Sequence, residues 1–448
     1  MKRLASQPVR LRTGGISCGK LTRMNHVARK ACQESRGPSL PIPYLIAIIL
    51  FSGCSPSDAP FNPLRVDPDL KRGPYVQAGD TETMLVIWQT FPVTGGAVEF
   101  GLTDALGMRI EAGDFGTTHS LLLRGLQPNT YYYYRVLDGD RPLSEIARFH
   151  TNHAPNDTDF SFLVLGDSGF GSRHMFYVAE LVNASAASFG LHTGDVVYRA
   201  GEEQFYDARF FYPFAQFLAT NVMYPSLGNH DLLTDDGAAY LRNFYLPENN
   251  MEGTERYYSF DYGHAHFVAL DTNQSSGPGS AQRTWLEQDL ATSTKPWKFV
   301  FFHHPPYSAG ISIEGDQRLV LENSRIRRDF VPLFEAFGVN IVFSGHSHSY
   351  ERTFPILQNQ AFDQEQEPDY VNPSGPVYIV TGGGGGPLTA LEPRSLNARA
   401  IAAYHFVEIS LSNKELIGRA VGLQSPTGGP TPYLRPGVVI DEFRIEQK

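Results

Sequence analysis

Short apolar runs alternate with helix-like segments through the C-terminal two thirds of the chain. Five of the runs end in a polar motif: LVLGDSG, LHTGDVVY, PSLGNHD, FVFFHH and IVFSGHSH. Just before the last run, apolar residues at positions i, i+3, i+4 and i+7 predict one buried helix face: Phe330, Leu333, Phe334 and Phe337. This alternation predicts an α/β domain in which helices cover a sheet core.

The segment that begins at Gly73 has a different pattern of apolar and turn residues. Short apolar runs separated by Gly, Pro and Thr turns predict the strands of a β-sandwich: Met84–Trp88, Ala97–Phe100 and Ser120–Leu123. In LQPNTYYYYRV, every second residue from Leu126 to Val136 is expected on the buried face. The four consecutive tyrosines therefore belong to two faces of one strand rather than to a ligand platform.

A polar stretch from His153 to Asp159 marks the boundary between these two patterns. We divide the chain into a leader (1–53), a linker (54–68), a small all-β sandwich (69–153) and an α/β domain (154–448). The tail of the last domain returns to strands: Tyr404–Ser410, Glu415–Val421 and Val438–Ile445.

The five polar motifs carry groups that can bind metal ions. In open α/β sheets, ligands bind beyond the carboxyl ends of the strands, where each of these motifs falls. Carboxylate and phenolate oxygens suit hard cations, whereas imidazoles suit borderline divalent ions. Seven such groups are too many for one four-coordinate ion and favour two metals with a bridging carboxylate. They are Asp167, Asp195, Tyr198, Asn229, His303, His346 and His348.

The ordered pattern GDxG, GDxxY, GNH, VxxH and GHxH resembles the purple acid phosphatases, a branch of the calcineurin-like metallophosphoesterases. The resemblance implies a two-sheet α/β sandwich, preceded by a fibronectin type III-like β-sandwich. It assigns one group of residues to the first metal: Asp167, Tyr198 and His348. It assigns another group to the second metal: Asn229, His303 and His346. Asp195 bridges the two.

Tyr198 bears on the identity of the metals. Many other metallophosphoesterases begin with a DxH motif, but this chain has Asp167-Ser168-Gly169 and supplies Tyr198 three residues after Asp195. That difference favours Fe(III) with a divalent partner, which is Zn, Mn or Fe. Two carboxylates and a phenolate neutralise three of the five positive charges, so a positive excess remains to activate water and bind phosphate.

The expected reaction is attack of a metal-bound hydroxide on a phosphate monoester. His230, beside Asn229, is the candidate general acid or transition-state ligand, and Asp231 is expected to orient it. His304 and Tyr307 are further candidates for contact with substrate. For His304, a packing role is an equal alternative, because only one of two adjacent strand residues faces a given side and the HxP spacing selects His303 as the ligand.

Other motifs have simpler interpretations. His264 and His266 lie in a segment that alternates like a hairpin and are expected to be structural. The run Gly382 to Gly386 lacks the GK[ST] ending of a P-loop, which favours a tight turn near the site.

Alternative functions are a phosphodiesterase or nucleotidase on the same dimetal site, or a non-catalytic surface binding protein. Specificity would depend on the loops around Tyr198 to Gln204 and Tyr307 to Asp316. Some members of the resembled family carry a histidine pair where this chain has Ser312 and Ile313. That departure leaves the substrate preference and the pH optimum open.

The N-terminal region resembles an export leader. Basic residues precede a short apolar stretch from Tyr44 to Phe51, which is too short to span a bilayer. The Ser-Gly-Cys ending resembles a bacterial lipoprotein signal, which predicts lipidation at Cys54, with plain secretion as the alternative. We expect export to the periplasm or the cell surface.

The composition argues against a nucleic-acid partner and against disulfide bonds. The first 36 residues hold nine Lys or Arg and one acid, so the chain from Cys54 onward carries a formal charge of about -18, given -10 for the whole. This acidity argues against binding to a nucleic-acid duplex. The three cysteines are Cys18, Cys32 and Cys54, so the remaining body contains no disulfide. The substrate is expected to be a small phosphate ester, and the sequence does not indicate an oligomeric state.

Overall fold

The computed structural model describes residues 62–314, 317–423 and 437–448. The predicted leader, Cys54 and most of the linker lie outside the described residues. In the part of the chain that is described, no helix is both long enough and apolar enough to cross a membrane.

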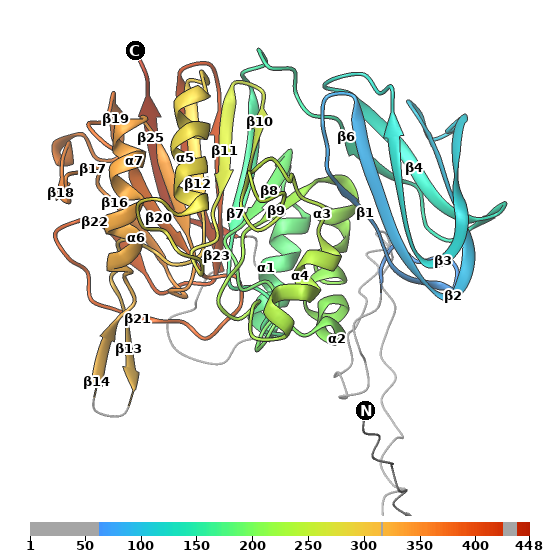
Figure 1. Ribbon diagram of the computed structural model, residues 1–448, viewed down its shortest axis with the longest axis horizontal. Helices are drawn as coiled ribbons and strands as arrows, with labels where there is room; N and C mark the ends of the chain where they lie inside the picture. The colour runs from blue at the N-terminus through green and yellow to red at the C-terminus, as the bar shows by residue number, and fades with distance from the viewer. Residues whose placement is uncertain (1–61, 315–316, 424–436) are drawn as a thin grey trace, which may run out of the picture. The chain divides into compact units, whose positions relative to one another are not determined.

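The N-terminal domain is all-β, as predicted. One antiparallel sheet curls around a core that includes Trp88, Val98 and Tyr134 (Figure 1). Its strands are β1 (Leu70–Gln77), β2 (Thr83–Gly101), β3 (Met108–Arg124), β4 (Tyr131–Asp138), β5 (Arg141–Pro142) and β6 (Ala147–His150).

Two of the predicted strands are halves of one long strand. β2 contains both Met84–Trp88 and Ala97–Phe100, and it pairs with β1 along its first half and with β4 along its second. A register shift between Gln89 and Thr94 separates the halves. The Gly, Pro and Thr residues that suggested a turn form this irregularity instead, because the strand bends there without ending.

The tyrosine run is confirmed as one strand with two faces. Within β4, Tyr132 and Tyr134 are buried, whereas Tyr131 is exposed. The predicted inward row starts too early, however, because Pro128 is exposed and precedes the strand.

The second domain contains two stacked seven-stranded sheets, and this mixed α/β architecture confirms the predicted fold class. The first sheet has the order β19-β25-β24-β23-β7-β8-β9, and the second has the order β10-β11-β12-β15-β20-β16-β22. The strands of the first sheet are β7 (Phe160–Leu165), β8 (Phe189–His192), β9 (Met223–Pro225), β19 (Asp369–Val371), β23 (His405–Leu411), β24 (Glu415–Gly422) and β25 (Val438–Glu446). Those of the second are β10 (Tyr258–Tyr262), β11 (Ala265–Ala269), β12 (Trp297–Phe301), β15 (Ile341–Ser344), β16 (Tyr350–Thr353), β20 (Val377–Thr381) and β22 (Asn397–Ile401). The last three strands of the chain match the predicted tail.

Strand alternation builds two cores in this domain. Phe299 of β12 faces the first sheet, where its ring lies 5.1 Å from that of Phe162. Phe302, three residues later, points to the opposite face of the sheet. It packs against Phe334 of a covering helix, with 6.1 Å between the ring centres. Period-two alternation therefore places one apolar layer between the sheets and another beneath the helices.

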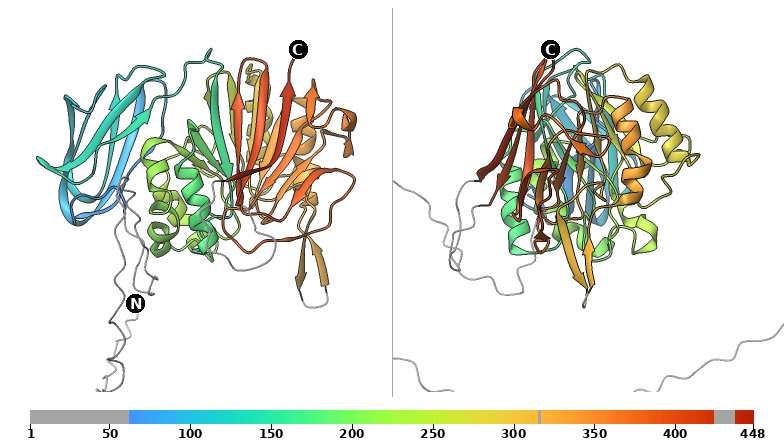
Figure 2. Two further views of the ribbon diagram at one scale, coloured as in Figure 1. Left: turned by 180° about the vertical axis from the view of Figure 1, so that it is seen from behind. Right: turned by 90° about the vertical axis from the view of Figure 1, so that its left-hand side faces the viewer.

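Helices cover the outer faces of the stacked sheets (Figure 2). The covering helices of the second sheet include α5 (Ala281–Thr292), α6 (Ser324–Asp329) and α7 (Val331–Ala336). The predicted helix face is buried at Phe330, Leu333 and Phe334, but a break at Phe330 separates α6 from α7, because Pro332 stands in the first turn of α7 and starts a new helix.

The remaining elements are short, apart from α1 (Arg173–Asn183), which contacts β23. Between β8 and β10 lie α2 (Glu203–Tyr206), a π-helical turn (Asp207–Phe211), α3 (Ala215–Thr220), a 3-10 turn (Asp235–Gly237) and α4 (Ala238–Asn243). A small sheet combines β13 (Gly310–Glu314), β14 (Gln317–Val320) and β21 (Ala390–Leu391). A hairpin and a further 3-10 turn complete the described elements: β17 (Ile356–Leu357), β18 (Gln360–Ala361) and Gln364–Gln366.

Candidate metal centre

The oxygen donors all follow strands of the first sheet. Asp167 comes after β7, Asp195 and Tyr198 come after β8, and Asn229 comes after β9. These three strands are parallel neighbours, so their carboxyl ends meet at one edge of the sheet. Asp167 and Asp195 adopt left-handed backbone conformations, with φ of 58° and 53°, which turn the chain sharply at the strand ends.

The nitrogen donors come from the second sheet. His303 follows β12 and His346 follows β15, while His348 lies two residues before the start of β16. His346 also adopts a left-handed conformation, with φ of 66°. The two sheets thus present their ligands toward one another across the same edge of the stack.

Tyr198 lies at the middle of one group of donors. Its hydroxyl oxygen is 2.9 Å from Asp167 Oδ1, 2.8 Å from Asp195 Oδ2 and 3.0 Å from His348 Nε2. His348 Nε2 in turn lies 3.4 Å from Asp167 Oδ1. These four side chains form one compact cluster.

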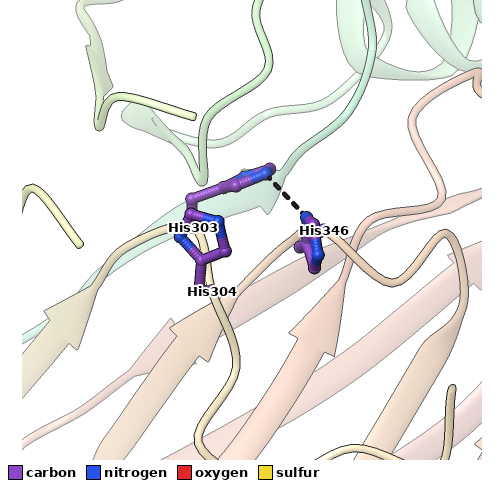
Figure 3. Close-up of side chains that lie close together, drawn as sticks. All are labelled: His303, His304 and His346. Carbon is purple, nitrogen blue, oxygen red and sulfur yellow. Dashed lines mark hydrogen bonds between the residues drawn. The ribbon is translucent and has the colours of Figure 1, made fainter. Parts of the chain in front are cut away.

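Asn229 lies at the middle of a second group. Its Oδ1 is 3.0 Å from His303 Nε2 and 3.1 Å from His346 Nδ1. The two imidazole nitrogens are 3.3 Å apart, as the dashed line in Figure 3 marks, and the rings meet edge to face, with 76° between their planes. Asp195 Oδ2 is 3.3 Å from His303 Nε2, so this carboxylate touches both groups. The structure therefore brings all seven predicted donors together, with Asp195 between the groups.

Backbone carbonyls orient two of the imidazoles. His303 Nδ1 donates to Thr193 O at 2.9 Å, and His348 Nδ1 donates to Pro387 O at 2.7 Å. In the neutral form of each ring, this bond keeps the proton on Nδ1, which leaves Nε2 free to bind a metal.

The charges of the cluster call for a cation. Burial, together with the nearby Asp167 and Asp195, raises the pKa of Tyr198 far above its usual range. Burial opposes ionisation of Asp195, but the neighbouring His303 and His230 hold the pKa of this carboxyl below its usual value. The same carboxylates raise the pKa of His303 to about 9. Buried oxygens that crowd each other are costly without compensating positive charge, so the donor set fits a pair of cations.

His230 lies beside the cluster with one free nitrogen. Its Nδ1 donates to Arg199 O at 2.5 Å, and its Nε2 lies 4.0 Å from Asp195 Oδ2. The side chain is 33% exposed. His230 can therefore reach both solvent and the centre through Nε2.

Asp231 does not orient His230, contrary to our expectation. Its Oδ1 accepts from Val196 N at 2.9 Å, and its Oδ2 accepts from Gly228 N at 2.9 Å. Burial and the charge of Asp195 raise the pKa of Asp231 to about 7. The carboxylate ties the Asp195 loop to the Asn229 loop, and the carbonyl of Arg199 holds the His230 ring instead.

His304 and Tyr307 have different surroundings. His304 lies against the second group, with its ring 4.8 Å from that of His346 and its Nδ1 2.8 Å from Thr272 Oγ1. Burial and the neighbouring imidazoles lower its pKa to about 2. Tyr307 is buried, donates to Asn359 Oδ1 at 2.8 Å and packs on Tyr378. Its hydroxyl is engaged by Asn359 and its ring packs in the helix-covered core, so contact with substrate stays a prediction.

The hairpin histidines have structural partners, as expected. The ring of His266 lies between Asp261, at 2.7 Å, and Asp289, at 2.8 Å. His264 Nε2 lies 3.3 Å from Ser412 O. Both side chains are buried away from solvent.

Sequence reasoning missed His192 and understated the glycine run. His192 is fully buried, bonds Ser168 Oγ at 2.9 Å and accepts from Gly194 N at 3.2 Å, which links the first two ligand loops. In the glycine run, Gly386 N donates to Asp167 O at 3.2 Å, and a Cβ there would collide with the ring of His348. The unusual five-glycine stretch was the signal that a backbone passes directly beside the ligands.

Comparisons with known proteins agree with this geometry. Residues 160–350 match the calcineurin-like phosphoesterase family, and residues 73–151 match the purple acid phosphatase N-terminal domain. Acid phosphatase type 7 of Mus musculus is 28% identical over 374 residues, which cover 75% of this chain and 83% of the relative. Purple acid phosphatase 15 of Arabidopsis thaliana is 30% identical over 303 residues, which cover 60% of this chain and 54% of the relative.

A solved structure shows the same fold. The purple acid phosphatase PPD1 from yellow lupin (Lupinus luteus) seeds has a TM-score of 0.71 and 20% sequence identity, with 84% of this chain and 75% of that chain covered. The purple acid phosphatases are a dimetal family, in agreement with the two groups of donors. From its two matched domains, its relatives and its ligand geometry, the chain is a purple acid phosphatase-like, metal-dependent phosphatase.

Proposed function

We propose that the enzyme hydrolyses phosphate monoesters and holds Fe(III) together with a divalent cation, which is Zn, Mn or Fe. The observation that carries this proposal is the position of the Tyr198 hydroxyl, within 3.0 Å of donor atoms on Asp167, Asp195 and His348. Fe(III) is a hard cation that suits a phenolate and two carboxylates. The family likeness supports the same pair of metals.

Each cation would be held by residues from both sheets. Asp167, Tyr198 and His348 would hold Fe(III), and Asp195 would be shared. The residues that would hold the divalent ion are Asn229, His303 and His346. When bound, two such cations lower the pKa of water to supply a nucleophile and neutralise the phosphoryl oxygens of the substrate.

His230 would supply the proton for the leaving group. The carbonyl of Arg199 fixes the proton of this ring on Nδ1 when the imidazole is neutral, and Nε2 faces the open side of the centre. A protonated Nε2 can donate to the alkoxide as the ester bond breaks, because the ring is anchored yet partly exposed. His304 would border the bound phosphate near His346.

Metal analysis combined with a visible spectrum tests the proposal. We expect one iron and one divalent metal for each chain and a tyrosinate-to-iron absorption band. A colourless, iron-free protein with full activity would refute the Fe(III) assignment. A substrate panel of monoesters, diesters and nucleotides tests the reaction, and a preference for diesters would favour the phosphodiesterase alternative.

A further inference from the structure

Strand β1 of the N-terminal sandwich contacts α3 and the π-helical turn of the second domain (Figure 1). Both elements lie in the chain between the Asp195 loop and the Asn229 loop. Four side chains of β1 make polar contacts with this part of the second domain. Lys71 is partly exposed and lies 3.4 Å from Asp207 Oδ2, whereas the other three are buried: Arg72, Tyr75 and Gln77. Their partners lie between Glu203 and Tyr245, the stretch that also carries Asn229 and His230.

Arg72 is fully buried and well satisfied. Its guanidinium donates to Asp207 and to Asn243 Oδ1, and it lies 3.4 Å from Glu203 Oε1. The same group stands 4.1 Å from the ring centre of Phe211. A buried cation is costly unless it is paired and hydrogen bonded, so this position strongly determines how the two domains dock.

Gln77 and Tyr75 make hydrogen bonds to the same part of the second domain. Gln77 Nε2 donates to Met223 O at 3.1 Å, and its Oε1 accepts from Tyr245 N at 3.3 Å. Tyr75 donates from its hydroxyl to Asn243 O at 3.1 Å. Met223 opens β9, the strand that ends in the Asn229 loop, so Gln77 holds the root of that loop.

A second path leads from Arg72 to Tyr198. Asp207, the partner of Arg72, begins the π-helical turn Asp207–Phe211. Arg209 of the same turn donates to the backbone carbonyl of Tyr198 and stacks 3.9 Å over Phe205. π-helical turns are uncommon and occur often at functional sites. The turn links a sandwich residue to the backbone of a candidate ligand through two side chains.

We propose that Arg72 and Gln77 are positioning residues for the metal centre. The sandwich is then a structural part of the catalytic unit, because it fixes the Tyr198 carbonyl through Asp207 and Arg209 and fixes the Asn229 loop through β9. This inference rests on the proposed function, in which Tyr198 and Asn229 hold cations.

Metal titration of the full-length apoprotein tests the inference. Fe³⁺, supplied as a weak citrate complex, and Zn²⁺ are titrated separately into wild type, Arg72→Met and Arg72→Lys. We expect Arg72→Met to lower the affinity for Fe³⁺ by about tenfold or more. Tenfold is the smallest loss usually seen when a group that supports a metal ligand is removed. The tyrosinate absorption band at saturation should shift, and Arg72→Lys should recover part of both effects.

Arg141→Met is the matched control. Arg141 also belongs to the sandwich and pairs with Asp67, Asp69 and Asp138, which all precede the second domain. We expect this variant to lower the stability of the sandwich without changing the metal affinity or the absorption band. An equal loss of metal affinity in Arg141→Met would overturn the positioning role.

Gln77→Leu keeps the test decisive if Arg72→Met does not fold. This variant removes only the two bonds to Met223 and Tyr245, and we expect a several-fold loss of Zn²⁺ affinity with less effect on the tyrosinate band. Wild-type affinity in a folded Arg72→Met or Gln77→Leu variant would refute the inference alone. A wild-type protein that takes up neither cation would refute the proposed function and this inference together.

Discussion

The two stacked sheets of the catalytic domain contribute different chemistry to one site. The first sheet supplies oxygen donors from Asp167, Asp195, Tyr198 and Asn229, whereas the second supplies only imidazole nitrogens. Each proposed cation would nevertheless be held from both sides, because His348 lies with Tyr198 and Asn229 lies with His303. Neither sheet alone brings together a full set of donors, so metal binding would depend on the stacking of the two sheets and would stabilise it.

Removal of Asp195 should break the arrangement most completely, because this carboxylate touches both groups. We expect Asp195→Ala to lose both cations. Its kcat should fall by much more than the roughly 100-fold expected when a group that only supports a metal ligand is removed. Metal content and turnover measure the effect. His303→Ala is the comparison from the second sheet, and it should lose only the divalent ion. Retention of both metals by Asp195→Ala would contradict the bridging role.

Substitution of His230 should spare the metals and slow the reaction. His230→Gln removes the proton at Nε2 but none of the seven donors, so we expect about a 100-fold fall in kcat, within the range for loss of a general acid. Both cations should remain. The fall should be smaller for substrates with a good leaving group, such as aryl phosphates, and an equal fall for all substrates would rule out the proton-donor role.

A histidine of the second sheet away from the site should affect stability instead. Asp261 and Asp289 raise the pKa of His266 to about 9, against 6.5 in the unfolded chain, although burial opposes the shift. Its protonation therefore stabilises the fold fully below pH 6.5, and this contribution is lost as the pH rises through about 9. We expect His266→Gln to cost on the order of 3 kcal/mol at pH 6, and less as the pH approaches 9.

Urea unfolding over a pH series measures this effect. His264→Gln serves as the control in the same hairpin, because burial lowers the pKa of His264, so its contribution to stability changes with pH in the opposite sense. A stability difference between wild type and His266→Gln that stays constant from pH 6 to pH 9 would contradict the role of its protonation.

The smallest effect is expected at Tyr307. Tyr307→Phe removes one hydrogen bond to Asn359 within the helix-covered core, so we expect about 1 kcal/mol of lost stability and unchanged kcat and KM. Chemical unfolding and steady-state kinetics check both parts. A raised KM would show instead that Tyr307 contacts substrate.

Local sequence patterns correctly predicted the strand ends and the donor side chains at those ends. Apolar runs with polar ends located the strand ends, and donor types at those ends located all seven side chains that converge. The buried and exposed alternation of the tyrosine run and the three tail strands follow from the same period-two rule.

The errors concern partners that are distant in sequence. Asp231 stands next to His230, yet its carboxylate is taken by the backbone of Val196, on a loop that sequence spacing does not place. The direction of the Tyr307 hydroxyl depends on Asn359, which lies 52 residues away in the sequence. No periodicity in the sequence encodes these contacts, because they depend on how finished elements pack.

An anomalous-difference map from crystals of the metal-loaded enzyme tests the central claim most directly. The account predicts two metal peaks on either side of the Asp195 carboxylate, one beside the Tyr198 oxygen with the absorption edge of iron, and one between Asn229 and His303. A single peak, or two peaks contacted by residues of only one sheet, would contradict it.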